Sequence, residues 1–454
     1  MAGVAKKIFK GTAALSLSAN IQTLISLLVF YILVTELQIA DYGVLVLLFT
    51  VPGIVLGIAG LGLIELIQSE IALARGVGDF KKIKGLIKGY LGLSLFLFTL
   101  VVVVSFYLKS YFVEDYSFIS VFYYPLVLFV FGQYFVNFFI NLLKSFEEFA
   151  KVAIIEVVEP LFRAFALVVM LFTVGINLEN AFVVYILSKW VAILFGIILS
   201  AGTTINIYRS GTITQNEIQY LIKRHGKWMI LRNMIDQLIA NAPAWLVNHF
   251  LTTSEVALYG VARKIFSIFS KVLPVQSVIF PIISKNIHND KIISFIIQKA
   301  RKYYMIFSIS IIIAVWLLID WAIIVVIPEY FAVSLLVKII FLKLILDAIG
   351  LGQKSILFAH RKQKFQFFLF LYGAVQRIIL LIIFIYYWGL VGLVISTLIH
   401  TSILIMIKRI YIQRNSWIKF DLLNYFKFDS YDKLILKKIY LRFRNLFFCK
   451  NYDY

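Results

Sequence analysis

The sequence predicts an all-α polytopic membrane protein of about twelve transmembrane helices, in two six-helix lobes related by a pseudo-repeat around a central cavity. Composition is the first observation behind this prediction. Hydrophobic residues make up 62% of the 454 residues, charged residues make up 15%, and the mean hydropathy is +0.93, whereas a soluble domain is roughly half apolar and a quarter charged. This composition excludes a water-soluble enzyme, and it also excludes a disordered chain, whose signature is low hydrophobicity.

The second observation is the length of the apolar segments. Each is near the roughly 20 residues that a helix needs to cross the hydrocarbon core, and none shows the alternation of a membrane β-barrel strand. Helices also satisfy their own backbone hydrogen bonds, which lipid requires. We expect spans over residues 12–34, 42–68, 86–108, 117–143, 150–174, 181–204, 228–250, 256–283, 303–327, 331–357, 365–387 and 389–411.

The third observation is the distribution of basic residues. If the N-terminus is cytoplasmic, 35 of the 44 lysines and arginines fall in segments on that side, and eight lie inside the expected helices. Only Lys109 falls in a segment on the other side. Because basic residues accumulate in cytoplasmic loops, both termini are expected in the cytoplasm. The net charge of +21 is then a consequence of topology, and no nucleic-acid partner is expected.

The expected organisation has four parts: an N-terminal lobe over 1–205, a cytoplasmic linker over 206–227, a C-terminal lobe over 228–411 and a basic tail over 412–454. A short pseudo-repeat supports the two lobes. The second expected helix opens with Asp41-Tyr42-Gly43 and the eighth with Leu258-Tyr259-Gly260. Parallel repeats of this kind occur in duplicated transporters.

The tail alternates basic with aromatic and aliphatic residues, which is typical of an amphipathic helix lying on anionic lipid of the inner leaflet. A solvated tail is the alternative.

Basic residues inside the membrane are the main candidates for a binding site, since each costs about 2.5–3.5 kcal/mol at a helix centre on insertion scales. Four lie midway along their helices: Arg163, Lys271, Lys343 and Arg377. Four lie nearer the outer helix ends: Lys264, Arg263, Lys189 and Lys338. We infer a hydrated cavity with a cationic wall, suited to a carboxylate, phosphate or pyrophosphate.

Acidic residues in the same helices have two interpretations. Glu159 and Arg163, Lys343 and Asp347, and Arg232 and Asp236 are each spaced i,i+4, so they can form ion pairs that lower the cost of insertion. They can also take part in transport. The candidates for ion coupling are Glu159, Asp236, Asp347 and His400.

A polar stripe runs along the fourth expected helix, where Gln133, Asn137 and Asn141 are spaced i, i+4, i+8. Carboxamides at this spacing can hydrogen-bond a sugar, and they can equally join one helix to another.

The motifs of several enzyme classes do not occur in the sequence. It has no G-x-x-x-x-G-K-[ST] phosphate loop, no H-E-x-x-H motif and a single cysteine, Cys449. No metal, cofactor or catalytic residue is therefore expected. The expected outer loops are short, which opposes a membrane glycosyltransferase. These observations favour a transporter over an enzyme.

Several segments together resemble a known family. They are the repeated D-Y-G and L-Y-G, the stretch from Lys264 to Ser284 that ends in F-P-I-I-S, and the basic turn from Leu357 to Lys364. Combined with twelve helices, they look like the polysaccharide-biosynthesis flippases of the multidrug/oligosaccharidyl-lipid/polysaccharide exporter superfamily. The resemblance covers about residues 6–412.

The resemblance implies alternating access in the bacterial cytoplasmic (inner) membrane. The substrate would be an undecaprenyl-diphosphate-linked oligosaccharide, moved from the inner to the outer leaflet for surface polysaccharide such as O-antigen or capsule. Polysaccharide polymerase machinery would be a partner. Two alternatives stay open: a drug/cation antiporter of the same superfamily, and a membrane glycan polymerase or ligase.

Overall fold

The computed structural model describes residues 2–59, 64–107, 109–208, 227–270, 283, 289–360 and 362–415. Within these ranges all regular secondary structure is helical, which confirms the predicted fold class. Most of the expected linker, residues 209–226, and most of the expected tail, residues 416–454, lie outside them. The division into lobes, linker and tail stays a prediction.

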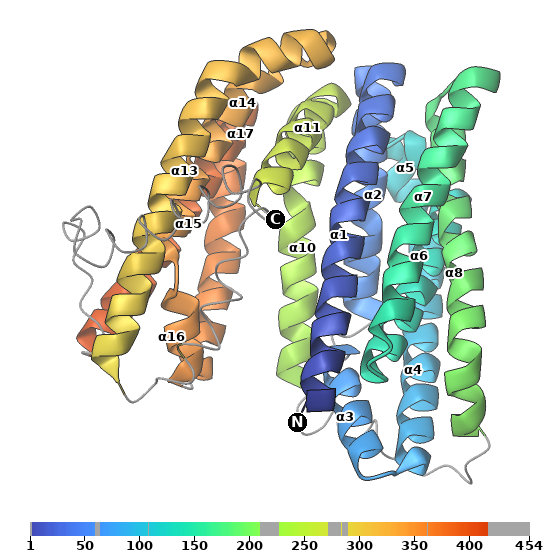
Figure 1. Ribbon diagram of the computed structural model, residues 1–454. Helices are drawn as coiled ribbons and strands as arrows, with labels where there is room; N and C mark the ends of the chain where they lie inside the picture. Colours follow the sequence, from blue (N-terminus) through green and yellow to red (C-terminus); the bar gives the residue numbers. More distant parts are fainter. Residues whose placement is uncertain are drawn as a thin grey trace, which may run out of the picture. The chain divides into compact units, whose positions relative to one another are not determined.

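The helices follow the expected order along the chain (Figure 1). They are α1 (Ala2–Glu36), α2 (Ile39–Ala59), α3 (Ile64–Gly76), α4 (Phe80–Tyr107), α5 (Lys109–Asp115), α6 (Phe118–Ser145), α7 (Phe149–Thr173), α8 (Leu178–Tyr208), α10 (Lys227–Phe250), α11 (Thr253–Ser270), α13 (Asp290–Val326), the 3₁₀ turn η2 (Pro328–Tyr330), α14 (Val333–Phe341), α15 (Lys343–Gly350), α16 (Gln353–Ala359) and α17 (Gln363–Arg414).

Seven of these helices are long and apolar enough to cross a membrane, counting only the described residues: α1, α2, α4, α6, α8, α13 and α17. Two of the expected spans, 365–387 and 389–411, lie within α17, on either side of a break at Gly389. The other expected spans correspond to α7, α10, α11 and the series from α14 to α16.

The described chain forms two compact units. The first holds residues 1–269, 318–340 and 370–397, and the second holds 270–317, 341–369 and 398–454. In the first unit α1 packs along α7, α6 and α7 pack against α8, and α2 packs against α10 (Figure 1). Buried aliphatic residues of α6, α7 and α8 form one core there: Val136, Leu143, Val152, Ile155, Ala192 and Ile193.

The second unit has its own apolar core. It joins α13, α16 and the last part of α17 through Ile297, Leu357 and Ile412, none more than 1% exposed. The buried Arg301 donates from Nε to the carbonyl oxygen of Leu351 at 2.8 Å, so a main-chain acceptor partly satisfies this basic side chain inside the core.

The glycines of the pseudo-repeat join α2 to α11 within the first unit. A Cβ built on Gly43 would lie on the carbonyl oxygen of Thr253, the first residue of α11. A Cβ built on Gly260 would lie 2.7 Å from Cγ2 of Val46 on α2. Each repeat glycine therefore lies at a close approach of the two helices, and this contact joins the second expected helix to the eighth.

Gly389 marks the turn between the last two expected spans. Its φ of +54° and ψ of −137° lie in a region that only glycine adopts without strain. We expect Gly389→Ala to lower the stability of the protein by about 1–3 kcal/mol, since open space around the residue leaves backbone strain as the main effect. Gly202→Ala is the control, because Gly202 is helical and nothing lies within 4 Å of its Cβ position. Equal thermal melting midpoints in detergent would contradict the prediction.

Candidate functional site

A polar cavity of about 550 Å³ lies among α2, α4, α6, α7, α8 and α10 of the first unit. Its volume falls within the roughly 300–1,000 Å³ of small-ligand sites. Fourteen residues line it: Phe49, Pro52, Gly53, Leu56, Gly57, Tyr90, Phe129, Gln133, Tyr134, Asn137, Arg163, Tyr185, Asn233 and Gln237.

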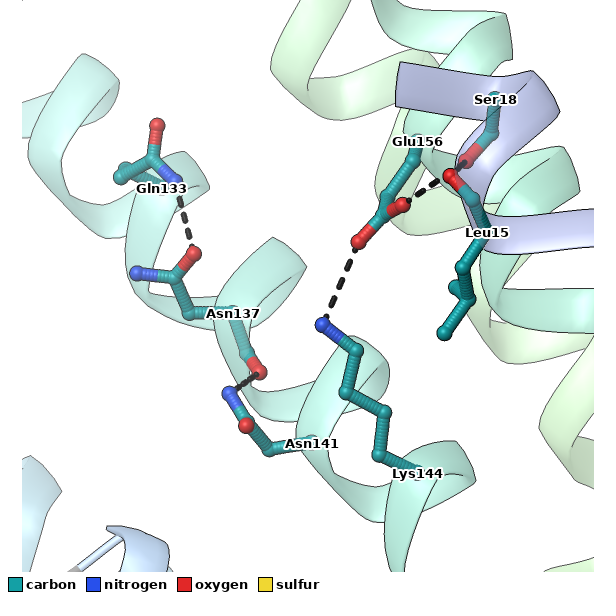
Figure 2. A network of polar contacts seen from close by, with 7 residues as sticks. All are labelled: Leu15, Ser18, Gln133, Asn137, Asn141, Lys144 and Glu156. Atoms are coloured by element: carbon teal, nitrogen blue, oxygen red, sulfur yellow. Dashed lines mark hydrogen bonds and ion pairs between the residues drawn. The ribbon is translucent and has the colours of Figure 1, made fainter. Parts of the chain in front are cut away.

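The predicted polar stripe of α6 forms one side of this cavity. Gln133 and Asn137 line it, and Gln133 Nε2 donates to Asn137 Oδ1 at 2.9 Å (Figure 2). Asn141 donates from Nδ2 to the carbonyl oxygen of Asn137 at 2.7 Å, further along the same helix. The Nδ2 group of Asn137 has no hydrogen bond to the described residues, so it is available to a ligand in the cavity.

A second stripe, on α10, was not predicted from the sequence. Asn233 and Gln237 line the cavity at i, i+4, and Asn241 follows at i+8. Two glycines of α2 allow this helix to come close. A Cβ on Gly57 would lie 2.8 Å from the side chain of Gln237, and one on Gly53 would lie 2.7 Å from Asn241 Nδ2. The cavity is thus lined by carboxamides from both α6 and α10.

Aromatic side chains complete the lining. The ring of Phe49 lies 4.4 Å from that of Tyr185 and 6.0 Å from that of Phe129. Tyr134 adds a buried hydroxyl without a hydrogen-bond partner among the described residues. Aromatic faces next to unpaired hydrogen-bonding groups suit ligands with apolar faces and polar edges, as sugar rings have.

Among the described residues, the only charged one that lines the cavity is Arg163, one of the predicted cations. Its Nη1 lies 3.4 Å from Glu159 Oε1, so the predicted i,i+4 pair is formed. The guanidinium carbon lies 4.4 Å from the centre of the Tyr185 ring, and Nε is buried without a hydrogen-bond partner in the part of the chain that the structure describes. Arg163 therefore keeps donor capacity for an anion inside the cavity.

Glu159 also binds a second cation. Lys189 of α8 places Nζ 2.5 Å from Glu159 Oε1, and the lysine is only 6% exposed. Glu159, Arg163 and Lys189, called here the charge triad, thus carry one negative and two positive charges when ionised. One carboxylate offsets one cation, so the triad has a net positive charge. Arg163 is the member of the triad that lines the cavity, and it places this charge there.

Glu156, one turn before the charge triad, ties three helices together. Its carboxylate lies 3.3 Å from Lys144 Nζ of α6 and accepts from the Ser18 hydroxyl of α1 at 3.2 Å (Figure 2). Ser18 donates as well to the carbonyl oxygen of Leu15 at 2.9 Å. These contacts hold the cavity-lining helices α6 and α7 in a fixed relation.

Other predicted cations are not among the residues that line the polar cavity. Lys338 pairs with Asp320 at 2.5 Å, and Lys343 pairs with Asp347 at 2.8 Å through the predicted i,i+4 spacing. Arg232 and Asp236, in contrast, form no ion pair within 4.0 Å in the described structure, and the Arg232 guanidinium lies 5.6 Å from the Phe370 ring.

Arg377 of α17 is half-buried in the first unit, and its Nε lacks a hydrogen-bond partner among the described residues. Its electrostatic neighbours are Tyr259, Arg263 and Asp236, so three predicted site residues lie near one another. Lys264 lies on α11 beside Arg263, and His400 lies on α17 in the second unit. Lys271 lies outside the described residues.

The described residues contain no group of three or more histidine, cysteine or acidic side chains able to hold a metal ion. The polar lining residues that the sequence analysis did not predict are Asn233, Gln237, Tyr90, Tyr134 and Tyr185. The i,i+4 spacing of Asn233 and Gln237 is the one signal that could have indicated two of them.

Solved structures of low sequence identity share this fold. A multidrug resistance MATE family transporter of the MOP superfamily, inward-facing, matches with TM-score 0.67 and 16% identity over 89% of this chain and 98% of its own. Lipid II flippase MurJ, in an inward closed conformation, matches with TM-score 0.67 and 14% identity over 98% of this chain and 94% of its own. A MOP superfamily transporter from Pyrococcus furiosus matches with TM-score 0.58 and 15% identity over 89% of this chain and 95% of its own. The fold is that of the multidrug/oligosaccharidyl-lipid/polysaccharide (MOP) transporters.

The sequence itself places the chain within this class. A family profile described as polysaccharide biosynthesis protein matches residues 8–287, which is more than half of the chain. The chain belongs to this family of multi-pass membrane proteins, and the predicted resemblance is confirmed. A search of curated proteins gives no match.

Proposed function

We propose that this protein is a flippase for an anionic, lipid-linked oligosaccharide, of the kind carried on undecaprenyl diphosphate. The polar cavity is the observation that carries this proposal, because it combines an arginine, carboxamides from two helices and aromatic side chains inside a membrane-spanning bundle. In this proposal the cavity takes the polar head group, and the head group moves from the cytoplasmic to the outer leaflet by alternating access.

The charge of the cavity favours an anionic head group over a cationic drug. Arg163 is the charged residue in the lining, and no carboxylate lines the described cavity. The nearest acid, Glu159, already contacts both Arg163 and Lys189. A guanidinium in a site of low dielectric binds phosphate or carboxylate oxygens through charge-assisted hydrogen bonds. A drug cation would find no counter-charge, which disfavours the antiporter.

The carboxamides support a glycan as the rest of the substrate. Gln133, Asn137, Asn233 and Gln237 offer donors and acceptors from both α6 and α10. Hydroxyl-rich ligands need many such groups, whereas a hydrophobic drug would leave buried carboxamides unpaired at a cost of about 1–3 kcal/mol each. The direction, from the cytoplasmic to the outer leaflet, is the one that the resemblance to polysaccharide-biosynthesis flippases implies.

The test is transport in cells deleted for this gene and given back Arg163→Ala or the wild type. Loss of one charge-assisted contact of about 1.5–3 kcal/mol is expected to lower the transport rate by roughly 10- to 100-fold. The measurement is the fraction of lipid-linked glycan that a membrane-impermeant oxidant can reach from outside intact cells. The deletion strain should keep complete lipid-linked units inaccessible.

The control is Arg232→Ala, which removes an exposed arginine that packs over Phe370 and does not line the cavity. It should transport at the wild-type rate at matched protein levels. Lipid-linked units that accumulate unpolymerised on the outer surface of the deletion strain would instead identify a polymerase. Unchanged surface glycan in that strain would favour the exporter.

A further inference from the structure

An apolar groove lies on the other face of α2 from the polar cavity. Its volume is about 630 Å³, and it is lined by residues of α2, α4 and α6 together with Lys109 of α5, Tyr116 and Trp245 of α10. Leu48, Val51, Ile54, Val55 and Ile58 of α2 line the groove, while Phe49, Pro52, Gly53, Leu56 and Gly57 line the cavity. One helix thus separates a polar site from an apolar one.

One end of the groove has the composition of a membrane interface. Lys109, Tyr116, Tyr123 and Trp245 line it where α4 ends and α6 begins. The rings of Tyr116 and Trp245 meet edge to face at 5.3 Å, and Tyr123 accepts or donates a hydrogen bond with Ser105 at 3.0 Å. Tyrosine, tryptophan and lysine gather at the headgroup layer of membrane proteins.

Lys109 offers a positive charge at that end. Its Nζ lies 5.3 Å from the Tyr123 ring and 5.1 Å from the Tyr124 ring, and within the described residues no carboxylate lies within 4.0 Å of it. Lys109 is also the one basic residue that the sequence assigns to the outer segments. An ammonium held by two aromatic faces, with no carboxylate within ion-pair distance among the described side chains, is suited to a phosphate.

The length of the groove matches one leaflet. Along α6, which begins at this end of the groove, the lining runs from Phe118 to Val130, a rise of about 18 Å at 1.5 Å per residue. Half of the roughly 30 Å hydrocarbon core is about 15 Å. A chain held here would therefore run from the headgroup layer to the bilayer centre, as an acyl chain does, whereas a long polyprenyl chain would extend well beyond the groove.

We propose that the apolar groove binds one acyl chain of an anionic glycerophospholipid, with the lipid phosphate at the Lys109 ammonium. By the expected topology this lipid belongs to the outer leaflet. The site depends on the chain spanning a membrane and is independent of what the polar cavity transports. Because α2 forms one side of both sites, a bound lipid supports the helix that lines the cavity.

The test is native mass spectrometry of the full-length protein, delipidated in mild detergent and then mixed with phosphatidylglycerol or phosphatidylcholine. Val104→Trp fills the groove, and Val103→Trp is its matched control. Both valines are 47% exposed, and only Val104 lines the groove. Wild type and Val103→Trp should retain one phosphatidylglycerol that Val104→Trp loses. Equal retention by the two tryptophan variants would overturn the proposal.

The headgroup contact has its own test in the same experiment. Lys109→Gln should lower the preference for phosphatidylglycerol over phosphatidylcholine about fivefold, the expected effect of one lysine near an anionic headgroup, while Lys109→Arg keeps it. If Lys109→Gln keeps the wild-type preference for phosphatidylglycerol, the lipid phosphate does not bind at Lys109. A polyprenyl diphosphate that displaces the bound phosphatidylglycerol from wild type, and no longer binds in Val104→Trp, would show that the groove holds the lipid carrier instead.

Discussion

Glu159→Gln is expected to destabilise the protein by about 3–5 kcal/mol, the usual cost of removing one partner from a buried ion pair. Among the described residues, this carboxylate is the only ion-pair partner of Arg163 and Lys189. Lys189 is 6% exposed, so the loss of Glu159 leaves an ammonium that neither water nor lipid can solvate. The measurement is the thermal melting midpoint in detergent together with the yield of folded protein in the membrane.

The matched control is Glu148→Gln, the same substitution at the start of the same helix. Glu148 pairs with Lys151 at 3.8 Å, and both side chains are more than 30% exposed. Surface pairs of this kind contribute about 0–1 kcal/mol, so Glu148→Gln should leave the melting midpoint nearly unchanged. Similar losses in both variants would mean that the charge triad does not act as a buried pair.

A second variant separates charge from packing. Adding Lys189→Met to Glu159→Gln removes the unpaired ammonium and keeps a side chain of similar length in its place. The double variant should recover the part of the lost stability that comes from Lys189, although Arg163 still lacks its carboxylate, so the two substitutions should be strongly non-additive. A double variant as unstable as the sum of the single variants would contradict the assignment of Lys189 as the main partner of Glu159.

The sequence predicts well those features that depend on a single helix. Hydrophobic length gave the twelve expected spans, and Gly389 lies between the last two of them. The i,i+4 rule predicted the Glu159–Arg163 and Lys343–Asp347 pairs, as well as the stripe of Gln133 and Asn137 that lines the cavity. Local spacing fixes which side chains share a helix face, so these features need no knowledge of tertiary structure.

Features that depend on two helices were not predictable in this way. Glu159 and Lys189 are thirty residues apart, and only the packing of α7 against α8 brings them together. Asp320 of α13 and Lys338 of α14 are likewise 18 residues apart, and they pair across two helices. The same limit applies to Arg232. The i,i+4 spacing predicts a pair with Asp236, but the guanidinium lies over Phe370 of α17 instead.

The contact between the repeat motifs gives the second prediction of large effect. In the interior of a helix, glycine to alanine normally stabilises by about 1 kcal/mol. Gly92→Ala should behave so, because nothing lies within 4 Å of its Cβ position in α4. Gly43→Ala should do the opposite, since the new methyl would meet the carbonyl oxygen of Thr253 and lie 2.8 Å from the carbonyl carbon.

A backbone carbonyl cannot rotate away as a side chain can, so α2 and α11 must separate in Gly43→Ala. Overpacking typically costs roughly 1–3 kcal/mol of stability, and we expect Gly43→Ala to lose about 3 kcal/mol or more. The variant should have a lower melting midpoint and reduced transport. Gly260→Ala should be milder, because its methyl meets the side chain of Val46 at 2.7 Å, and Val46→Ala should relieve that contact. If Val46→Ala restores the melting midpoint of Gly260→Ala but not that of Gly43→Ala, the strain lies at the crossing of α2 and α11. If Gly43→Ala has the same melting midpoint as Gly92→Ala, the close approach of the repeat motifs is not required for the fold.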